Sequence, residues 1–203
     1  LNNTPRQINM FNALGVEPPF YAHLPMILGS DGAKLSKRHG ADDIREYREK
    51  GYLPEAVLNY MVRLGWSYGD QEIFSIEEMI KYFNISNINH SASSFNPQKL
   101  SWINQQHIIN LPSDKLGLSL APFLKKAGIN ISNGPALSEV ADGFKERSET
   151  LYQMAHDARY CFEDFDEIDS KAAKKNLRTV ILEPLREVRN AFFNIRSWEK
   201  DFI

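Results

Sequence analysis

The sequence feature that most constrains the fold is a series of apolar stripes with helical spacing after residue 112. Leucine, valine, methionine and phenylalanine recur there at intervals of three and four residues, which places them on one face of an α-helix. The four stripes span residues 116–124, 137–144, 151–162 and 177–192. Amphipathic helices joined by short polar connections predict a helical bundle with these stripes in its core. Pro184 lies inside the fourth stripe and is expected to break or kink that helix.

The preceding segment, residues 42–110, carries start and stop signals for shorter helices. Asp42 and Asp43 suit the N-cap of a helix that ends near Gly51. Pro54 suits the first turn of the next helix.

Two further helix starts follow in the same segment. Ser75 and Glu78 have the spacing of a capping box. The pair at residues 96–97 is Asn-Pro, which predicts a helix running to about Gln105. Residues 72–74, between the helix that begins at Pro54 and the helix that begins at Ser75, are expected to form a short strand.

The first 40 residues have a different pattern and are expected to form a short α/β piece. Thr4 and Pro5 can begin a helix that Gly15 ends. Residues 20–28 are rich in apolar side chains and predict a buried strand. Residues 33–40 read Ala-Lys-Leu-Ser-Lys-Arg-His-Gly without periodicity, which predicts a loop.

Composition excludes several classes of protein. The formal net charge of −2 provides no general attraction to nucleic acid, so an RNA or DNA partner would need a local basic face. Cys161 is the one cysteine, which excludes an internal disulfide and a cysteine-rich zinc site, and the histidines lack metal-site spacing. No apolar run approaches the roughly 20 residues that span a bilayer. We therefore expect a reduced, cytosolic protein without a metal site or a membrane partner.

Local basic clusters nevertheless occur at three places, and each is a candidate for contact with phosphate groups. They are Lys34, Lys37 and Arg38; Arg45, Arg48 and Lys50; and Lys171, Lys174, Lys175 and Arg178. A solvated helix face is the alternative interpretation of the last two clusters.

The loop at residues 33–40 has the composition of a phosphate clamp. Lys34 and Lys37 are three residues apart on one loop, so their ammonium groups can converge, and lysine is a compact cation with three donors. Ser36 adds a hydroxyl, and Gly32 and Gly40 flank the loop. Ligands of open α/β sheets bind beyond the carboxyl ends of strands. A mobile phosphate clamp beside a sheet is therefore predicted, and an exposed basic turn is the alternative.

The segment Lys34-Leu35-Ser36-Lys37-Arg38 resembles the KMSKS loop of class I aminoacyl-tRNA synthetases, in the form found in the glutamyl branch. Similarity to bacterial-type glutamyl-tRNA synthetases continues to about residue 110. It is carried by residues 1–7, 23–25, 46–56, 59–60, 64–66, 72–74 and 95–104. Beyond that point it rests on the helical pattern and on Arg147, Leu151, Ala158 and Arg159.

The resemblance implies a mainly α fold with three parts. Residues 1–41 would be a small α/β remnant of a Rossmann-like catalytic domain, ending in the KMSKS loop. Residues 42–110 would be a stem-contact region, and residues 111–203 an α-helical anticodon-binding bundle that is truncated.

The resemblance also implies an ATP-dependent glutamate–tRNA ligase. In that family, glutamate attacks the α-phosphate of ATP to give glutamyl-adenylate and pyrophosphate, and the terminal ribose hydroxyl of tRNA(Glu) then takes the glutamyl group. Lys37 would be the principal ATP-binding lysine and Lys34 would assist it, with Mg²⁺ accompanying ATP. Leu35, Ser36 and Arg38 would complete the ATP-binding loop.

Contacts to adenine and RNA follow from the same resemblance. Met26 and Ile27 lie where the backbone of the family contacts adenine. Arg147 falls where the family uses an arginine to sense the last anticodon base, by a forked hydrogen bond or by stacking. Arg45 and Arg48 would meet the acceptor-side backbone. A solvated arginine at a helix end is the alternative for Arg147.

One signature of the family, a His-x-Gly-His element in its N-terminal half, is absent from the sequence. The resemblance implies a monomeric, cytoplasmic enzyme. Because the His-x-Gly-His element is absent, these residues alone are not expected to aminoacylate tRNA.

The competing hypothesis is a standalone helical RNA-binding or interaction module, which would have no reason to retain an intact phosphate loop. An unrelated phosphate-binding protein would need a glycine-rich P-loop, which the sequence lacks. Specificity for glutamine tRNA is left open.

Overall fold

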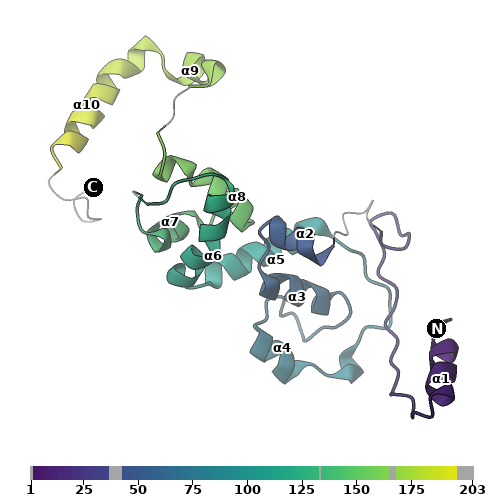
Figure 1. The fold of residues 1–203 in the computed structure, drawn as a ribbon. Coiled ribbons are helices and arrows are strands. Elements are labelled where there is room, and N and C mark those ends of the chain that lie inside the picture. Colours follow the sequence, from purple (N-terminus) through teal and green to yellow (C-terminus); the bar gives the residue numbers. More distant parts are fainter. Residues whose placement is uncertain (1, 37–42, 133, 165–167, 196–203) are drawn as a thin grey trace. The chain divides into compact units, whose positions relative to one another are not determined.

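The computed structural model describes residues 2–36, 43–132, 134–164 and 168–195. By contacts the chain divides into two compact units, Leu1–Phe162 and Glu163–Ile203. The described residues are almost entirely helical or irregular (Figure 1), and pairing between their extended segments is limited to isolated bridges. The mainly α fold is thereby confirmed.

The helices of the first unit follow one another along the chain with irregular connections. They are α1 Thr4–Ala13, α2 Ile44–Glu49, α3 Pro54–Arg63, α4 Ile76–Tyr82, α5 Pro97–Asn110, α6 Ser113–Lys126, α7 Leu137–Phe144 and α8 Leu151–Asp157, with 3₁₀ turns at Ile85–Asn87 and Arg159–Cys161. The second unit contains α9 Ser170–Asn176, a 3₁₀ turn Thr179–Ile181 and α10 Leu182–Phe193. No helix among the described residues is both long and apolar enough to cross a bilayer.

The predicted helix starts are confirmed by their caps. The side chain of Asp43 accepts a hydrogen bond from the backbone of Arg45 at the start of α2. Ser75 and Glu78 form a complete capping box at α4, satisfying backbone donors that would otherwise lack partners. The side chain of Asn96 caps α5 by accepting from the backbone of Lys99.

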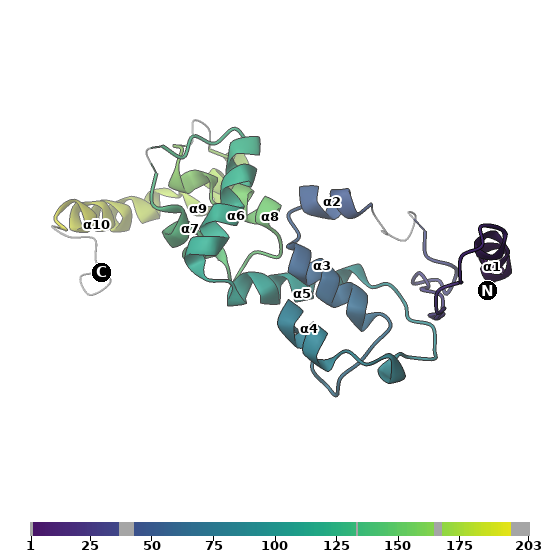
Figure 2. The same ribbon diagram turned by 60° about the horizontal axis from the view of Figure 1, so that its bottom comes forward.

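Helices α3 and α5 lie side by side (Figure 2) and form one part of the main core. Ala56 of α3 and Ile103 and Ile108 of α5 have no exposed surface. The backbone N–H of Asn96 donates to the hydroxyl of Tyr60 at 2.6 Å. That bond ties the start of α5 to α3.

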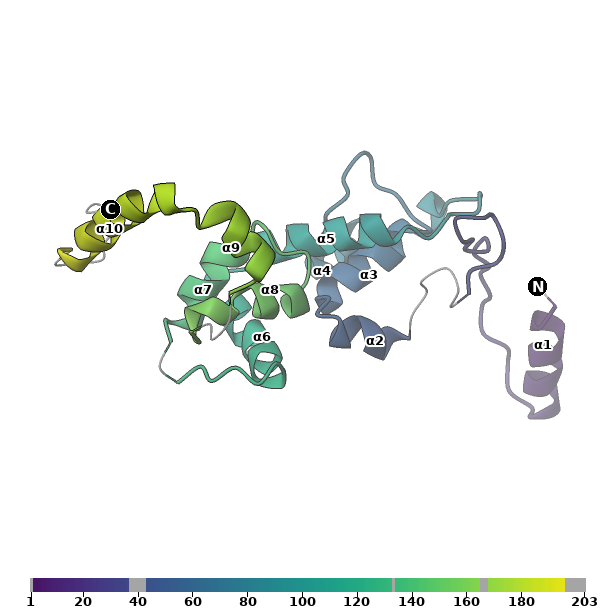
Figure 3. The same cartoon turned by 90° about the horizontal axis from the view of Figure 1, so that it is seen from above.

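The other part of the core is formed by α6, α7 and α8, which pack together (Figure 3) as the first three apolar stripes predict. Leu120 of α6 and Met154 of α8 are completely buried. Gly117 lets α7 approach α6 closely, because a Cβ atom there would lie 2.8 Å from the carbonyl of Leu137.

The fourth apolar stripe was expected in the core, but its side chains are partly exposed. Leu185, Val188 and Phe192 on α10 are 45–48% exposed. The stretch 177–192 is interrupted, as predicted from Pro184: a 3₁₀ turn at Thr179–Ile181 precedes α10, and Pro184 is the third residue of that helix. The first turn of a helix has backbone N–H groups without intrahelical partners, so a proline is tolerated there.

Both predicted strands are wrong. Residues 20–28 form no strand beyond a single bridged position at Leu28, and Phe20 is fully exposed. Residues 72–74 are also irregular, because the side chain of Asn59 takes the place of a strand partner. Its amide donates to the carbonyl of Glu72 at 3.0 Å, and its oxygen accepts from the backbone of Phe74 at 2.9 Å.

Candidate functional site

The expected phosphate loop begins in a tight turn that is anchored at Leu28. The backbone N–H of Leu28 donates to Ser93 at 2.9 Å, and its carbonyl accepts from Phe95 at 2.7 Å. On the other side, Leu28 forms an antiparallel bridge with Lys34. Gly32 has a φ of 74°, a left-handed conformation that favours glycine and closes the turn. Single bridges on both sides of Leu28 thus replace the sheet edge that the sequence predicts.

Of the five loop residues, the structure describes Lys34, Leu35 and Ser36. Lys34 is exposed, whereas Leu35 is half-buried against the main core and its N–H donates to the carbonyl of Ile27 at 3.0 Å. Lys37 and Arg38, together with Gly40, lie outside the described residues. The first lysine therefore stands at a fixed, solvent-facing position, and the convergence of the two lysines stays a prediction.

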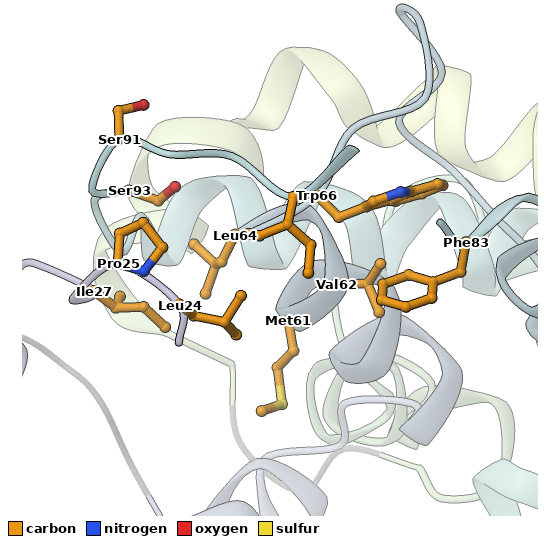
Figure 4. Close-up of a pocket in the computed structure, with 12 residues that line it drawn as sticks. Leu24, Pro25, Ile27, Met61, Val62, Leu64, Trp66, Phe83, Ser91 and Ser93 are labelled. Carbon is orange, nitrogen blue, oxygen red and sulfur yellow. The ribbon is translucent and has the colours of Figure 1, made fainter. Parts of the chain in front are cut away.

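The segment that leads into this turn rests on α3 across an open apolar cavity of about 280 Å³ (Figure 4). Leu24 and Ile27 approach from the segment, and Met61 and Leu64 approach from α3 and its C-terminal end. Met26 is 55% exposed, which corrects its expected place in a buried strand.

Helix α2 carries the two arginines expected near the acceptor stem. Both Arg45 and Arg48 are exposed. Arg45 forms a forked pair with Asp43, at 3.0 Å from Nε and 3.2 Å from Nη2. The hydrogen bond to Asp43 raises the pKa of the Arg45 guanidinium. Because the Arg45 guanidinium is already paired with the Asp43 carboxylate, Arg48 is the better candidate of the two for contact with a phosphate.

A junction of hydrogen bonds connects the turn after α2 to the turn before α8. The carbonyl of Gly51 accepts from the backbone of Leu151 at 2.9 Å. The side chain of Asn104, which is completely buried, accepts from the N–H of Leu53 at 2.8 Å and donates to the carbonyl of Glu149 at 2.6 Å. Residues far apart in sequence are thereby held together, and the sequence gives no pairing signal for them.

Arg147 lies in the turn between α7 and α8. Its guanidinium carbon is 3.9 Å from the ring centroid of the buried Phe144. Its Nη2 donates to the hydroxyl of Tyr160 at 3.2 Å. The guanidinium is exposed to solvent and contacts two aromatic side chains, whereas the alternative interpretation is a solvated arginine at a helix end.

A buried polar network between α3 and α5 was not predicted. The oxygen of Asn59 accepts from Nε2 of His107 at 3.0 Å as well as from the backbone of Phe74. Burial lowers the pKa of His107, an effect that the charge of Glu55 partly opposes. The sequence signal that could have indicated this network is an asparagine, Asn59, between residues 57 and 60 of the apolar helical stripe.

The described residues contain no group of three or more His, Cys, Asp or Glu side chains that could hold a metal ion. Cys161 is a free thiol, and burial raises its pKa, which favours the neutral form.

Comparison with known families agrees with these features. Residues 1–102 match the family described as tRNA synthetases class I (E and Q), catalytic domain. Residues 115–203 match an anticodon binding domain. The chain belongs to the class I tRNA synthetases of the glutamate and glutamine group.

Two curated relatives within this class are both glutamate–tRNA ligases. The chain is 54% identical over 98% of its length to "Glutamate--tRNA ligase 1" of Nitrosococcus oceani and 48% identical over its whole length to "Glutamate--tRNA ligase 2" of Halorhodospira halophila. It spans 42% and 43% of these proteins.

Two solved structures are also similar. A glutamate tRNA ligase from Elizabethkingia meningosepticum, crystallised with its amino acid, superposes with a TM-score of 0.75 at 28% identity, over 96% of this chain and 43% of that protein. A glutamate-tRNA synthetase from Elizabethkingia anophelis superposes with a TM-score of 0.70 at 30% identity, over 92% and 42%.

Proposed function

We propose that residues 1–203 form the ATP-loop and tRNA-binding part of a glutamate–tRNA ligase. The observation that carries the proposal is similarity along the whole chain: identity near 50% to two glutamate–tRNA ligases includes both the lysine loop and the helical bundle. A module retained only for RNA binding would have no need of the loop.

The loop would act on the first reaction step. A carboxylate oxygen of glutamate attacks the α-phosphorus of ATP, the bond to the β-phosphate oxygen breaks, and pyrophosphate leaves. Negative charge grows on the phosphate oxygens during this step. Lys34 is exposed at the start of the loop, and Lys37 would act with it. Cations that meet those oxygens best in the transition state lower the barrier.

Adenine would lie near the segment before the loop. The carbonyl of Ile27 already accepts the N–H of Leu35. Of the two residues expected there, Met26 is therefore the better candidate for a backbone contact with the base. Its exposed side chain leaves room for a ligand beside it.

Magnesium would accompany ATP in the parent enzyme. Octahedral Mg²⁺ commonly takes one or two carboxylates, water and substrate phosphates. It would neutralise part of the phosphate charge when it is bound.

The second substrate is tRNA(Glu). In the second step, the terminal ribose hydroxyl attacks the glutamyl carbonyl and AMP leaves. Arg147, held over Phe144, would contact an anticodon base, and Arg48 would contact the acceptor-side backbone. We place the working boundaries of the three parts at residues 41 and 110, and we propose a cytoplasmic monomer without a membrane partner.

A chimera tests the function directly. In the Nitrosococcus oceani relative, the segment that matches this chain is replaced by residues 1–203, and charging of tRNA(Glu) with labelled glutamate is measured. The chimera should charge tRNA, whereas residues 1–203 alone should not, because the His-x-Gly-His element is absent from this sequence. Lys34→Ala and Lys37→Ala should each lower kcat, by about a hundredfold for the stronger.

A matched control is Lys115→Ala, which removes an exposed lysine from α6 and should leave charging unchanged. A chimera that binds tRNA(Glu) but charges no glutamate would instead favour the standalone RNA-binding module. Full charging by the double variant Lys34→Ala/Lys37→Ala would overturn the role given to the loop.

A further inference from the structure

Tyr160 presents an unusual surface beside Arg147. It lies in the 3₁₀ turn Arg159–Cys161, after α8, and is 67% exposed. One side of its ring leans on Phe144, with centroids 5.8 Å apart and planes 46° apart. Exposed tyrosines are common, but this ring contacts a buried aromatic side chain while most of the residue stays open to solvent.

The hydroxyl of Tyr160 is coupled to the arginine. It accepts the hydrogen bond from Nη2 of Arg147, and the same guanidinium lies over the ring of Phe144. Ring and guanidinium are thus fixed next to each other on one supporting residue. A long side chain held in this way loses less conformational entropy on binding than a free one.

The backbone around Arg147 is also held in place. The side chain of Gln105 donates to the carbonyl of Glu146 at 2.9 Å, and Asn104 donates to that of Glu149 at 2.6 Å. The buried hydroxyl of Ser148 donates to the carbonyl of Phe144 at 3.0 Å. The backbone of the turn that carries Arg147 is therefore held by three side-chain hydrogen bonds.

A second arginine is adjacent to Tyr160 in the sequence. Arg159 donates to the carbonyl of Ala127 at 2.8 Å, directly after two lysines in the last turn of α6. The positive charge that contacts Tyr160 itself is that of Arg147, whose Nη2 lies 3.2 Å from the hydroxyl. An exposed aromatic ring beside a cation suits a nucleotide, because RNA is bound by stacking of unpaired bases together with attraction of the backbone.

We propose that the exposed ring of Tyr160 is the stacking platform for one unpaired base of the tRNA, and that its hydroxyl positions Arg147 against the edge of that base. The proposal rests on the proposed function, since it needs tRNA as the partner. It gives Tyr160 two separable roles. The ring supplies affinity for any base, and the hydroxyl supplies discrimination through Arg147.

The experiment measures binding of the full chain to an anticodon stem-loop of tRNA(Glu) by fluorescence anisotropy. A set of RNAs carries a single abasic site at each loop position in turn. One abasic position should weaken wild-type binding about tenfold, and Tyr160→Leu should weaken binding of the intact RNA by a similar factor. The two losses should not add, because each removes the same stacking contact.

Tyr160→Phe separates the two roles. It keeps the ring, so it should bind the intact RNA within about threefold of wild type. It should lose the preference for the natural base at the sensitive position, as Arg147→Gln does. A purely structural role of Tyr160 would leave that base preference unchanged.

Tyr152→Leu is the matched control, since Tyr152 is a half-exposed tyrosine on α8 that contacts His156 rather than an arginine. It should bind every RNA like wild type. If Tyr160→Leu proves unstable in thermal unfolding, Tyr160→Trp tests the platform with a larger ring and should bind at least as tightly as wild type. If the loss of affinity from Tyr160→Leu adds to the loss from every abasic site, the stacking proposal is wrong but the proposed function is unaffected. If the wild-type chain does not bind tRNA, both the stacking proposal and the proposed function are wrong.

Discussion

Residues 53–162 and residues 2–36 contain the same kinds of apolar side chain, but only the first region buries them. In the first region the main core includes Leu120, Ile103 and Met154, none of which has exposed surface. In the second region Gly29 is the one buried residue, although all 35 positions are described. Leu14 and Phe20 there are 75% and 107% exposed.

The difference shows that an apolar stripe specifies a helix without specifying its burial. Helix α1 forms at the predicted residues and has an apolar side, yet none of its residues is buried. Helices α6, α7 and α8 carry comparable stripes and bury them because each packs against another. The number of neighbouring elements, rather than the pattern itself, decides which stripe contributes to stability.

The same substitution in both regions gives the largest contrast. Leu120→Ala should lower the free energy of unfolding by about 4 kcal/mol, because it leaves a cavity among completely buried side chains. Leu14→Ala should change it by less than about 0.5 kcal/mol, because the side chain is mostly exposed already. Urea unfolding followed by circular dichroism measures both. Equal losses would mean that the two regions are equally well packed.

Two glycines with similar backbone conformations give the next contrast. Gly51 and Gly15 have φ values of 82° and 67°. A Cβ atom at Gly51 would lie 2.8 Å from the backbone nitrogen of Leu151, whereas nothing lies within 4 Å of one at Gly15. Gly51→Ala should therefore destabilise by about 3 kcal/mol, and Gly15→Ala by about 1 kcal/mol from its backbone conformation alone. A similar shift in the urea midpoint for both would contradict the close contact at Gly51.

The buried amide of Asn104 gives a smaller effect within the first region. Asn104→Ala should destabilise by about 2 kcal/mol, since it leaves the N–H of Leu53 and the carbonyl of Glu149 without their partner. Asn110→Ala, at the exposed end of the same helix, is the control and should be neutral within about 0.5 kcal/mol. Thermal unfolding of the two variants distinguishes them. A neutral Asn104→Ala would show that water replaces the amide.

The smallest effect is a pH dependence of the first region. Because burial lowers the pKa of His107, the unfolded chain takes up the proton first as pH falls. Stability should therefore be complete above the ordinary histidine pKa of about 6.5 and should decrease as pH falls below it. Urea midpoints measured between pH 7.5 and about 5.5 report the slope. His107→Gln should flatten it, and an unchanged slope in that variant would assign the effect to other groups.

Much of the helical structure was predictable because its signals are local. The caps at Asp43, Ser75 and Asn96 and the stop at Gly15 depend on a few neighbouring residues, and the sequence displays them directly. The strands predicted at 20–28 and 72–74 were wrong, because pairing needs a partner that a local pattern does not identify. At 72–74 that partner is the side chain of Asn59, which comes from another element.

The candidate site divides in the same way. The lysine loop and Arg147 stand out in the sequence by residue type and by resemblance. The contacts that orient Arg147 stand out less. Phe144 is only three residues away, but Tyr160 reaches Arg147 through the packing of α8 and the turn that follows it. Asn104 carried a weak signal, a polar residue adjacent to the buried Ile103, but its partners lie 51 and 45 residues away.

The hydrogen bonds of Gly51 and Asn104 have a consequence for recombination between the two family segments. The two family matches end at residue 102 and begin at residue 115, so the gap between them contains the end of α5 and the start of α6. The groups that Asn104 and Gly51 meet across the junction are main-chain atoms of Leu53, Glu149 and Leu151. Any side chain can supply such atoms. Recombination between diverged genes at this gap should therefore preserve these hydrogen bonds, provided that position 51 stays glycine and position 104 stays asparagine.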